Sequence, residues 1–426
     1  MNSVPQDNAY LATGPVGRLL LKFSVPCVLS MLVSALYNIV DQVFIGQSVG
    51  YLGNAATNVV YPFTVVALAL ALLVGDGAAA LLSLSLGKGD EETGRRCVGH
   101  AAVLIVVVGI VLMTVGFVWM DPLLRLFGVT EASYAYAYEY FQVILLGIPF
   151  YVFASGMNST IRADGAPGYS MFATVLGAVL NLILDPVAIF VLDMGVRGAA
   201  IATVLSQAVG AIWIIRFLTG PKTTLRLKKE YLKPEGKIVL PVLALGISTF
   251  VMMSTESLLS ISFSSSLARY GGDVAVGAMT VITSVSQLAS MPVSGVCQGG
   301  QPVMSFNFGA GKKERVKEAF RFQLLVCFGY TAIFWVLMML VPGVVAGIFT
   351  SDATLIQYTT WAMRIYMAGI FSLGIQIACQ QSFMALGQAK VSLLLACLRK
   401  LILLIPLIFI LPHVVADPVF GVFLAE

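Results

Sequence analysis

Charged residues are scarce in this chain. Asp, Glu, Lys and Arg make up 11% of its 426 residues, whereas hydrophobic residues make up 58%. Soluble domains carry about 25% charged residues, so a large soluble core is excluded. Apolar runs long enough to be transmembrane helices recur along the chain, and they are not the short alternating segments of a membrane β-barrel. The sequence therefore predicts an all-α polytopic membrane protein.

The residues that usually carry enzyme chemistry are also few. The two histidines, His100 and His413, are isolated, and none of the six cysteines forms a C-x-x-C pair. Neither a metal site nor a disulfide framework is expected. No Walker A motif is present, and the net charge of +4 indicates basic loops, not a nucleic-acid surface. We therefore expect no enzyme, no cofactor and no nucleic-acid partner.

The order of the apolar segments predicts the membrane topology. Residues 1–15 lack the basic region and cleavage site of a signal peptide, so the first helix is expected to direct insertion. Eleven segments can each supply the ~20 residues needed to cross ~30 Å of hydrocarbon. They lie at about 18–46, 52–85, 97–120, 134–158, 169–193, 197–218, 238–266, 274–306, 318–346, 356–384 and 391–412.

Basic residues concentrate on one side of these predicted spans. The longest clearly polar segment, residues 221–237, carries six of them: Lys222, Arg226, Lys228, Lys229, Lys233 and Lys237. Lysine and arginine in short loops mark the cytoplasm, so the N-terminus and this segment are predicted to be cytoplasmic. Six crossings then precede the segment, and the second half enters the membrane as the first does. The predicted parts are an N-terminal lobe (1–218), a basic linker (219–237) and a C-terminal lobe (238–426).

The two halves share a register. Gly87 and Gly89 match Gly309 and Gly311 at an offset of 222 residues (309 − 87), and Gly165 matches Gly387 at the same offset (387 − 165). One ungapped offset over this span predicts an internal duplication into two pseudo-symmetric six-helix lobes. The helix that opens at Gly198 should have a counterpart near residue 420, where only VFGVFLAE remains. The last helix is therefore expected to be truncated, in a natural product that continues further.

Two carboxyl groups lie deep in the apolar runs of the first half. Asp41 is 19 residues above Lys22, and Asp185 is 16 residues above Tyr169, which gives ~28 and ~24 Å of helix. A carboxylate at such depth costs ~2.5 kcal/mol or more and indicates a functional site.

Asn38 precedes Asp41 by three residues and Asn181 precedes Asp185 by four, so each pair shares a helix face. Three interpretations stay open. The acids face water at the outer interface, they share a cavity in which one carboxyl takes up and releases a proton, or their oxygens hold a small cation.

Other charges interrupt the apolar runs. Asp76, in LLVGDGAAALL, is expected either to line a vestibule or to be solvated. Glu256 is the only acid deep within the second half, where Arg399 and Lys400 interrupt LLLACLRKLILLIPL. A buried cation needs a partner, and Glu256 is the candidate. The alternative is that the two cations extend to a membrane interface.

Several of these stretches together resemble the multidrug and toxin extrusion (MATE) family, in one of its bacterial branches. They are SVPCVLSMLVSALYNIVDQVFIGQ, SLGKGD with its repeat FNFGAGK, GMNSTIRADGAPGYSM, and NLILDPVAIF followed by GVRGAAIATVLSQ. The resemblance implies two lobes arranged as a V and alternating access by rocking. It also implies a first-lobe coupling site at Asp41, Asn158, Asn181, Asp185 and Thr203. Another branch uses two second-lobe acids, of which Glu256 matches one, but no carboxylate lies between Trp361 and Met384 to match the other.

The expected function is multidrug efflux, with xenobiotic transport and antibiotic resistance as its context. Amphipathic organic cations would leave in exchange for H⁺, or for Na⁺ held at Asp41 and Asp185. A lipid-linked oligosaccharide flippase of the same superfamily is the alternative, and the first-lobe acids argue against it. We expect a monomer in the inner membrane of a bacterium, surrounded by lipid, with its N-terminus in the cytoplasm.

Overall fold

The computed structural model describes residues 9–221, 223, 225–349 and 352–426, so Lys222 of the basic linker lies outside the described residues. Within these ranges every regular element is helical. Eleven helical segments of the described chain are long and apolar enough to cross a membrane, as predicted.

The first six spans fill the first half of the chain. They are α2 (Val16–Ser48), α3 (Tyr51–Gly87), α4 (Glu91–Val118), α6 (Tyr134–Ala163), α7 (Pro167–Pro186) with the π-helical η2 (Val187–Val191), and α8 (Gly195–Thr219). Two short helices lie beside them, α1 (Ala9–Thr13) and α5 (Met120–Leu126). The linker contains the 3₁₀ turn η3 (Lys229–Leu232).

The second half begins with α9 (Gly236–Gly309), a pair of spans that meet at the non-helical Gly272. The next three spans are α10 (Lys313–Leu340), α12 (Ala353–Tyr366) continued by η4 (Met367–Ser372) and α13 (Leu373–Ala385), and α14 (Ala389–Cys397) continued by the π-helical η5 (Leu398–Leu404) and α15 (Ile405–Val414). Two short helices complete it, α11 (Pro342–Phe349) and α16 (Pro418–Leu424). The predicted stub near residue 420 falls in α16.

Helix α4 extends past its apolar run because a polar residue caps its start. Helix α4 begins at Glu91, before the predicted residue 97, and the Asp90 side chain accepts a 3.0 Å hydrogen bond from the backbone N–H of Thr93. Such a cap satisfies a backbone donor that the first helical turn leaves free. Hydrogen bonds from Thr93 also hold the pKa of Asp90 below its usual value. Hydropathy alone therefore places this helix start several residues too late.

The duplication is visible in the backbone. Gly89 and Gly311 have φ of 79° and 73°, and Gly165 and Gly387 have 89° and 75°. A third pair at the same offset, Gly50 and Gly272, has 77° and 64°. Because glycine reaches positive φ without steric cost, these positions fix the same turns in both halves. Helix α10 likewise begins and ends 222 residues after α4 (313 − 91 and 340 − 118).

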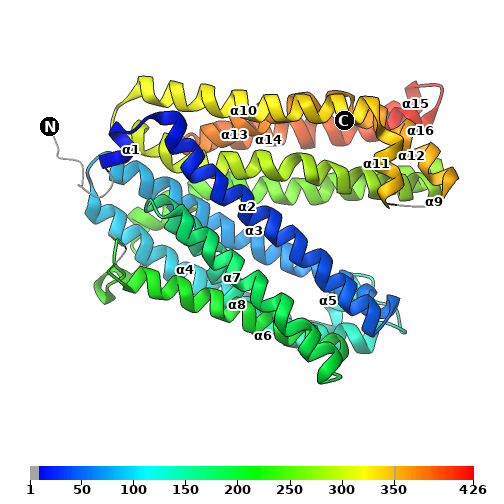
Figure 1. The fold of residues 1–426 in the computed structure, drawn as a ribbon, viewed down its shortest axis with the longest axis horizontal. Helices are drawn as coiled ribbons and strands as arrows, with labels where there is room; N and C mark the ends of the chain where they lie inside the picture. The colour runs from blue at the N-terminus through cyan, green and yellow to red at the C-terminus, as the bar shows by residue number, and fades with distance from the viewer. Residues whose placement is uncertain (1–8, 222, 224, 350–351) are drawn as a thin grey trace.

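The two halves form two lobes that spread apart as a V (Figure 1). Helices α2 to α8 make the first lobe, and α9 to α15 make the second. The lobes meet at the end that carries α1 and the turns at 88–90 and 310–312, which we call the basic end, and they diverge toward α5 and α11.

Glycines bring the lobe backbones into direct contact near the basic end. A Cβ added at Gly246 of α9 would lie 1.7 Å from the carbonyl oxygen of Leu73 in α3. One added at Gly77 would lie 2.0 Å from the carbonyl oxygen of Val242. Real Cβ atoms cannot approach so closely, so only glycine permits this packing. Close contacts of the same kind occur at Gly87, Gly295, Gly299 and Gly309.

The N-terminal segment also joins the lobes. Carbonyl oxygens of Leu11, Ala12 and Gly14 accept hydrogen bonds from three second-lobe side chains: Asn307 at 3.0 Å, Lys312 at 2.8 Å and Arg315 at 2.6 Å. Tyr10 of the same segment donates a 3.0 Å hydrogen bond to the carbonyl oxygen of Gly165 in the first lobe. Residues 10–14 therefore bridge the lobes at the basic end.

Gly246→Ala is expected to lower stability because the new methyl group cannot fit against Leu73. Overpacking of this kind costs about 1–3 kcal/mol, so the thermal unfolding temperature of the purified protein should fall by several degrees. Gly329→Ala in α10 is the matched control, because no atom lies within 4 Å of the added Cβ. Equal unfolding temperatures for the two variants would contradict the backbone contact.

Candidate functional site

A polar cavity of about 170 Å³ lies inside the first lobe. Four tyrosines line it together with one carboxylate and several amide and hydroxyl groups. The lining residues are Tyr37, Asn38, Asp41, Gln42, Thr57, Asn58, Val60, Tyr61, Thr64, Tyr140, Ile144, Ile148, Tyr151, Thr203 and Gln207. They come from α2, α3, α6 and α8, so a single lobe forms the cavity.

Asp41 lines this cavity and lies close enough to Asp185 for the two carboxyl groups to interact electrostatically. The residues are 8% and 1% exposed. Asn181 donates to Asp185 Oδ1 and to Thr203 Oγ1, both at 3.2 Å. The predicted residues Asp41, Asn181, Asp185 and Thr203 thus form one cluster, and the acids are not simply solvated at an interface.

One oxygen of each acid is left without a donor. Asp41 Oδ1 and Asp185 Oδ2 have no hydrogen-bond partner, and no Lys or Arg of the described chain forms an ion pair with either acid. Two neighbouring carboxylates in a poorly hydrated site repel each other unless a proton or a cation lies between them. The arrangement can therefore bind a proton or a small cation by its oxygens.

Local sequence places both acids. Asp185 stands at the end of α7, where Pro186 has no N–H to donate and the chain widens into the π-helical η2. On α2, Gln42 follows Asp41 and its amide donates a 3.1 Å hydrogen bond to Thr57 of α3. Neither Gln42 nor Thr57 is among the residues predicted for the site. The signal was available, because Gln42 adjoins an intramembrane acid and Thr57 interrupts an apolar run.

The two remaining asparagines of the predicted site lie apart from the carboxyl pair. Asn38 lines the cavity but makes no side-chain hydrogen bond among the described residues. Asn158 donates a 3.3 Å hydrogen bond to Thr174 of α7, and its carbonyl oxygen has no partner. It therefore joins α6 to α7 and does not contact the acids directly.

Asp76 differs from both expectations, since it is neither solvated nor in a vestibule. It is buried and accepts a 2.7 Å hydrogen bond from Ser159, to which Arg162 donates at 2.9 Å. Thr249 of the second lobe lies 3.5 Å from its other oxygen. Asp76 of α3 thus contacts α6 of its own lobe and α9 of the other, so it belongs to the contact between the lobes near the basic end.

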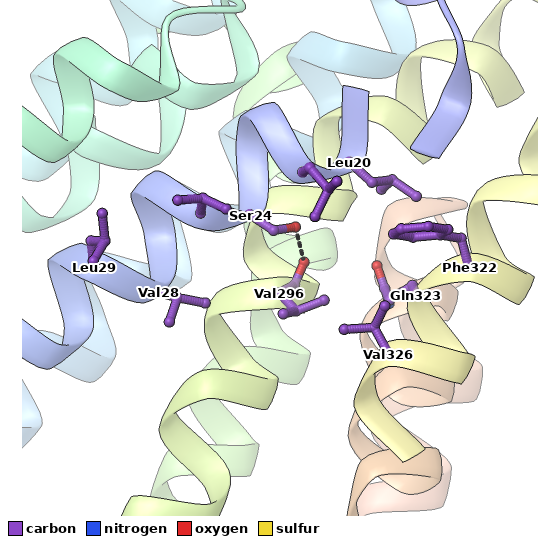
Figure 2. A pocket seen from close by; sticks show the side chains of 10 residues that line it. Leu20, Ser24, Val28, Leu29, Val296, Phe322, Gln323 and Val326 are labelled. Atoms are coloured by element: carbon purple, nitrogen blue, oxygen red, sulfur yellow. Dashed lines mark hydrogen bonds between the residues drawn. The ribbon is translucent and has the colours of Figure 1, made fainter. Parts of the chain in front are cut away.

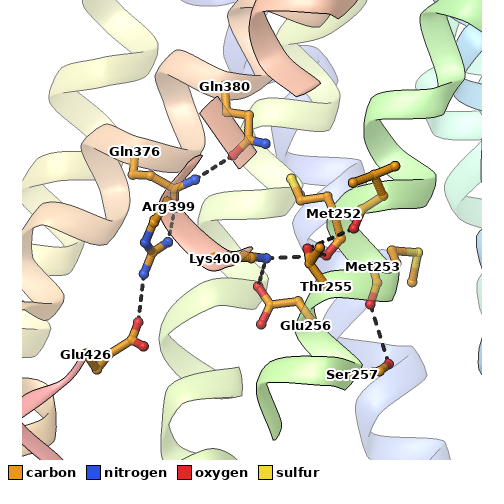
Figure 3. Close-up of polar contacts among 11 residues, drawn as sticks. Met252, Met253, Thr255, Glu256, Ser257, Gln376, Gln380, Arg399, Lys400 and Glu426 are labelled. Carbon is orange, nitrogen blue, oxygen red and sulfur yellow. Dashed lines mark hydrogen bonds and ion pairs between the residues drawn. The ribbon is translucent and has the colours of Figure 1, made fainter. Parts of the chain in front are cut away.

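Figure 3 shows two ion pairs of the second lobe. Glu256 pairs with Lys400, which is buried and does not extend to an interface. Arg399 does not share that partner. It pairs with Glu426 at 2.7 Å and donates to Gln376 at 2.8 Å, because adjacent residues of η5 point in different directions. The prediction of Glu256 as the partner is therefore correct for Lys400 and wrong for Arg399.

A second cavity, of about 180 Å³, lies between α2, α9 and α10 at the seam of the lobes (Figure 2). Its lining is apolar except for Ser24, which donates to the carbonyl oxygen of Val296 at 3.0 Å, and Gln323. The other lining residues are Leu20, Leu21, Val25, Val28, Leu29, Val296, Phe322 and Val326. Without a charged group, this cavity does not provide an ion-binding site.

Comparison with known proteins gives a consistent result. The MatE family model matches residues 26–187 and again 248–410, and the two matches begin 222 residues apart (248 − 26). The chain is 26% identical over 405 residues to the multidrug export protein MepA of Staphylococcus aureus strain N315, covering 94% of this chain and 88% of that protein. The MepA of Staphylococcus saprophyticus is 24% identical with the same coverage.

Solved structures share the fold. An outward-facing multidrug resistance MATE family transporter of the MOP superfamily superposes with a TM-score of 0.92 at 24% identity, covering 99% of this chain and 94% of that one. A MOP superfamily transporter from Pyrococcus furiosus gives 0.91 at 24% identity, with 99% and 95% coverage.

Asp185→Asn is expected to stabilise the protein at pH 8. The substitution removes one of two adjacent charges, and the introduced amide can donate to Asp41, whose unsatisfied oxygen costs about 1–3 kcal/mol. The thermal unfolding temperature should rise by several degrees, whereas Glu139→Gln, at an exposed acid of α6, should leave it unchanged. A fall for Asp185→Asn alone would mean that the pair is already neutralised.

Proposed function

Because the chain belongs to the MatE family, we propose that it is a secondary antiporter that exports amphipathic organic cations in exchange for H⁺ or Na⁺. The observation that carries this proposal is the buried pair of Asp41 and Asp185 at a tyrosine-lined cavity, with no ion-pair partner among the described lysines and arginines. The names of the MepA relatives, which describe multidrug export, support the same function.

The carboxyl pair supplies the coupling. With a proton or Na⁺ between them, Asp41 and Asp185 are largely neutralised, and the cavity loses its attraction for an organic cation. When that ion leaves, an organic cation can bind in its place. If the two ligands compete and each favours a different orientation of the lobes, the two fluxes are coupled. Asn181 and Thr203 orient the pair, Asn38 contacts the ligand, and Asn158 supports the site through α7.

The lining of the cavity suits an organic cation. Tyr37, Tyr61, Tyr140 and Tyr151 provide aromatic faces, to which cations are attracted by about 0.5–2 kcal/mol each. A flippase for anionic lipid-linked sugars would need cationic groups there, and the lining contains Asp41 and no Lys or Arg. The charge of the cavity therefore favours cation export over the flippase alternative.

The arrangement of the lobes gives the access route. We assign the basic end to the cytoplasm of a bacterial inner membrane, because basic loops are retained there. The lobes are joined at that end and apart at the other, as expected for a state open to the outside, and the fold resembles that of an outward-facing relative. Rocking about the joint would then expose the cavity to the cytoplasm. We expect residues 1–218 and 238–426 to move as two lobes of one monomer, with 219–237 as the cytoplasmic linker.

Asp41→Asn and Asp185→Asn are each expected to reduce gradient-driven transport to about a tenth or less of the parent rate, since the coupling ion loses its site. The assay is uptake of a fluorescent organic cation by inverted membrane vesicles, with a proton gradient or a sodium gradient imposed separately. Glu139→Gln is the control for expression and folding. Undiminished transport by Asp41→Asn would place coupling elsewhere, and no transport under either gradient by folded protein would favour the flippase.

Tyr37→Leu is expected to weaken binding of an organic cation, whereas Tyr37→Phe should preserve it. Tyr37 lies one helical turn before Asp41 and lines the same cavity. Loss of one aromatic face should raise the dissociation constant about 2- to 30-fold, corresponding to about 0.5–2 kcal/mol. Equilibrium binding of the fluorescent cation to purified protein measures this. A similar loss in both variants would indicate that the hydroxyl group, not the ring face, binds the ligand.

A further inference from the structure

The two lobes treat their intramembrane acids differently. In the first lobe Asp41 and Asp185 lie beside each other, and no Lys or Arg of the described chain forms an ion pair with them. In the second lobe the intramembrane Glu256 pairs with Lys400, and Glu426, which follows the last described span, pairs with Arg399 (Figure 3). A cation from solution is therefore attracted strongly to the first site, whereas the second is already neutral.

The amine of Lys400 is fixed from within the protein. Its Nζ contacts a carboxylate oxygen of Glu256 and lies 3.3 Å from the carbonyl oxygen of Met252, one turn earlier on α9. The Lys400 side chain is only 4% exposed, but that of Glu256 is 62% exposed. An acid in a membrane-spanning helix faces the bundle interior or a water-filled space, because lipid would not solvate its charge. The carboxylate is thus accessible from water, while the cation that binds it reaches it from the protein side.

The neighbouring charges do not replace Lys400. Arg399 is held by Gln376 and Glu426. Glu426 and Tyr366 also interact electrostatically with Glu256, and neither is a cation. Lys400 alone neutralises Glu256 among the described residues.

We propose that Lys400 is a resident ammonium ion that occupies a cation site formed by Glu256 and the Met252 carbonyl group, and that it thereby confines the transported cation to the first lobe. The confinement of the transported cation rests on the proposed function, whereas the occupation of the site by Lys400 does not. A tethered amine competes at a high effective concentration, so a free cation of ordinary affinity cannot displace it. Lys400 is in this sense a specificity-determining residue, since it removes a second acidic site from the route of the cation.

Chemical rescue tests the site itself. Lys400→Ala removes the atoms of an n-propylammonium ion and leaves both acceptors in place. In this variant n-propylammonium chloride should raise the thermal unfolding temperature by several degrees over an equal concentration of tetramethylammonium chloride, because a ligand that binds the native state stabilises it. The parent and Lys400→Arg should show no such difference, since their site is filled.

Two results would overturn the proposal. One is the absence of rescue in Lys400→Ala, and the other is equal rescue in Lys400→Ala with Glu256→Gln, which lacks the carboxylate. Lys400→Ser, which also lacks the Cγ to Nζ atoms, serves with the same expected rescue if the alanine variant does not fold. Lys400→Met is the control, because the methionine side chain fills the space of the lysine stem, and it should bind an added n-propylammonium ion weakly or not at all.

Confinement is tested separately by counting sites for a fluorescent organic cation in equilibrium binding. Parent protein should bind one equivalent and Lys400→Ala two, with the second lost when Glu256→Gln is added. One equivalent in Lys400→Ala would refute confinement. If the parent does not bind the fluorescent cation while n-propylammonium still rescues Lys400→Ala, the proposed export of organic cations is wrong. The occupation of the Glu256 site by Lys400 would still be supported.

Discussion

A charged side chain inside a membrane must be neutralised or solvated by neighbouring protein groups or water, because lipid chains cannot solvate it. This constraint organises the molecule. The second lobe neutralises Glu256 with Lys400, and the joint between the lobes buries Asp76 among donors that include Ser159, near Arg162. Asp41 and Asp185, in contrast, form no ion pair with a Lys or Arg of the described chain, and one oxygen of each has no hydrogen-bond partner. The two π-helical segments of the described chain, η2 and η5, adjoin or contain these charged positions, and such wide turns often occur at functional sites.

Duplication has preserved the backbone of the two halves more faithfully than their chemistry. The paired glycines keep equivalent turns, but the position equivalent to Asp41 is Phe263 (41 + 222), and the position equivalent to Lys400 is Ala178 (400 − 222). One lobe has thus kept an unpaired acidic site, and the other has become internally balanced. Symmetric lobes can rock against each other, while the asymmetric charges give the cation one place to bind.

Much of this could be predicted from sequence, for identifiable reasons. Hydropathy gave the eleven spans because transmembrane helices need a fixed apolar length. Helix spacing grouped Asn181 with Asp185, and the family resemblance added Thr203. The position of Asp76 could not be foreseen, because its burial depends on how α3 packs against α9. Nor could sequence decide between Arg399 and Lys400 as the partner of Glu256, since adjacent helical residues differ by about 100° and the phase of η5 is set by its π turn. Cavity-lining residues such as Thr57 required the tertiary arrangement of four helices.

The contact between the lobes is made largely by bare backbone at glycines such as Gly77 and Gly246. Packing that uses backbone atoms at glycines does not depend on the identity of the side chains elsewhere on these helices. Residues that face the cavity can therefore change by mutation without altering the joint about which the lobes would turn. In evolutionary terms, the positions that determine what is recognised are separate from those that determine how the molecule moves. Such a protein can acquire new ligands by single substitutions while its glycine joint stays under strict selection.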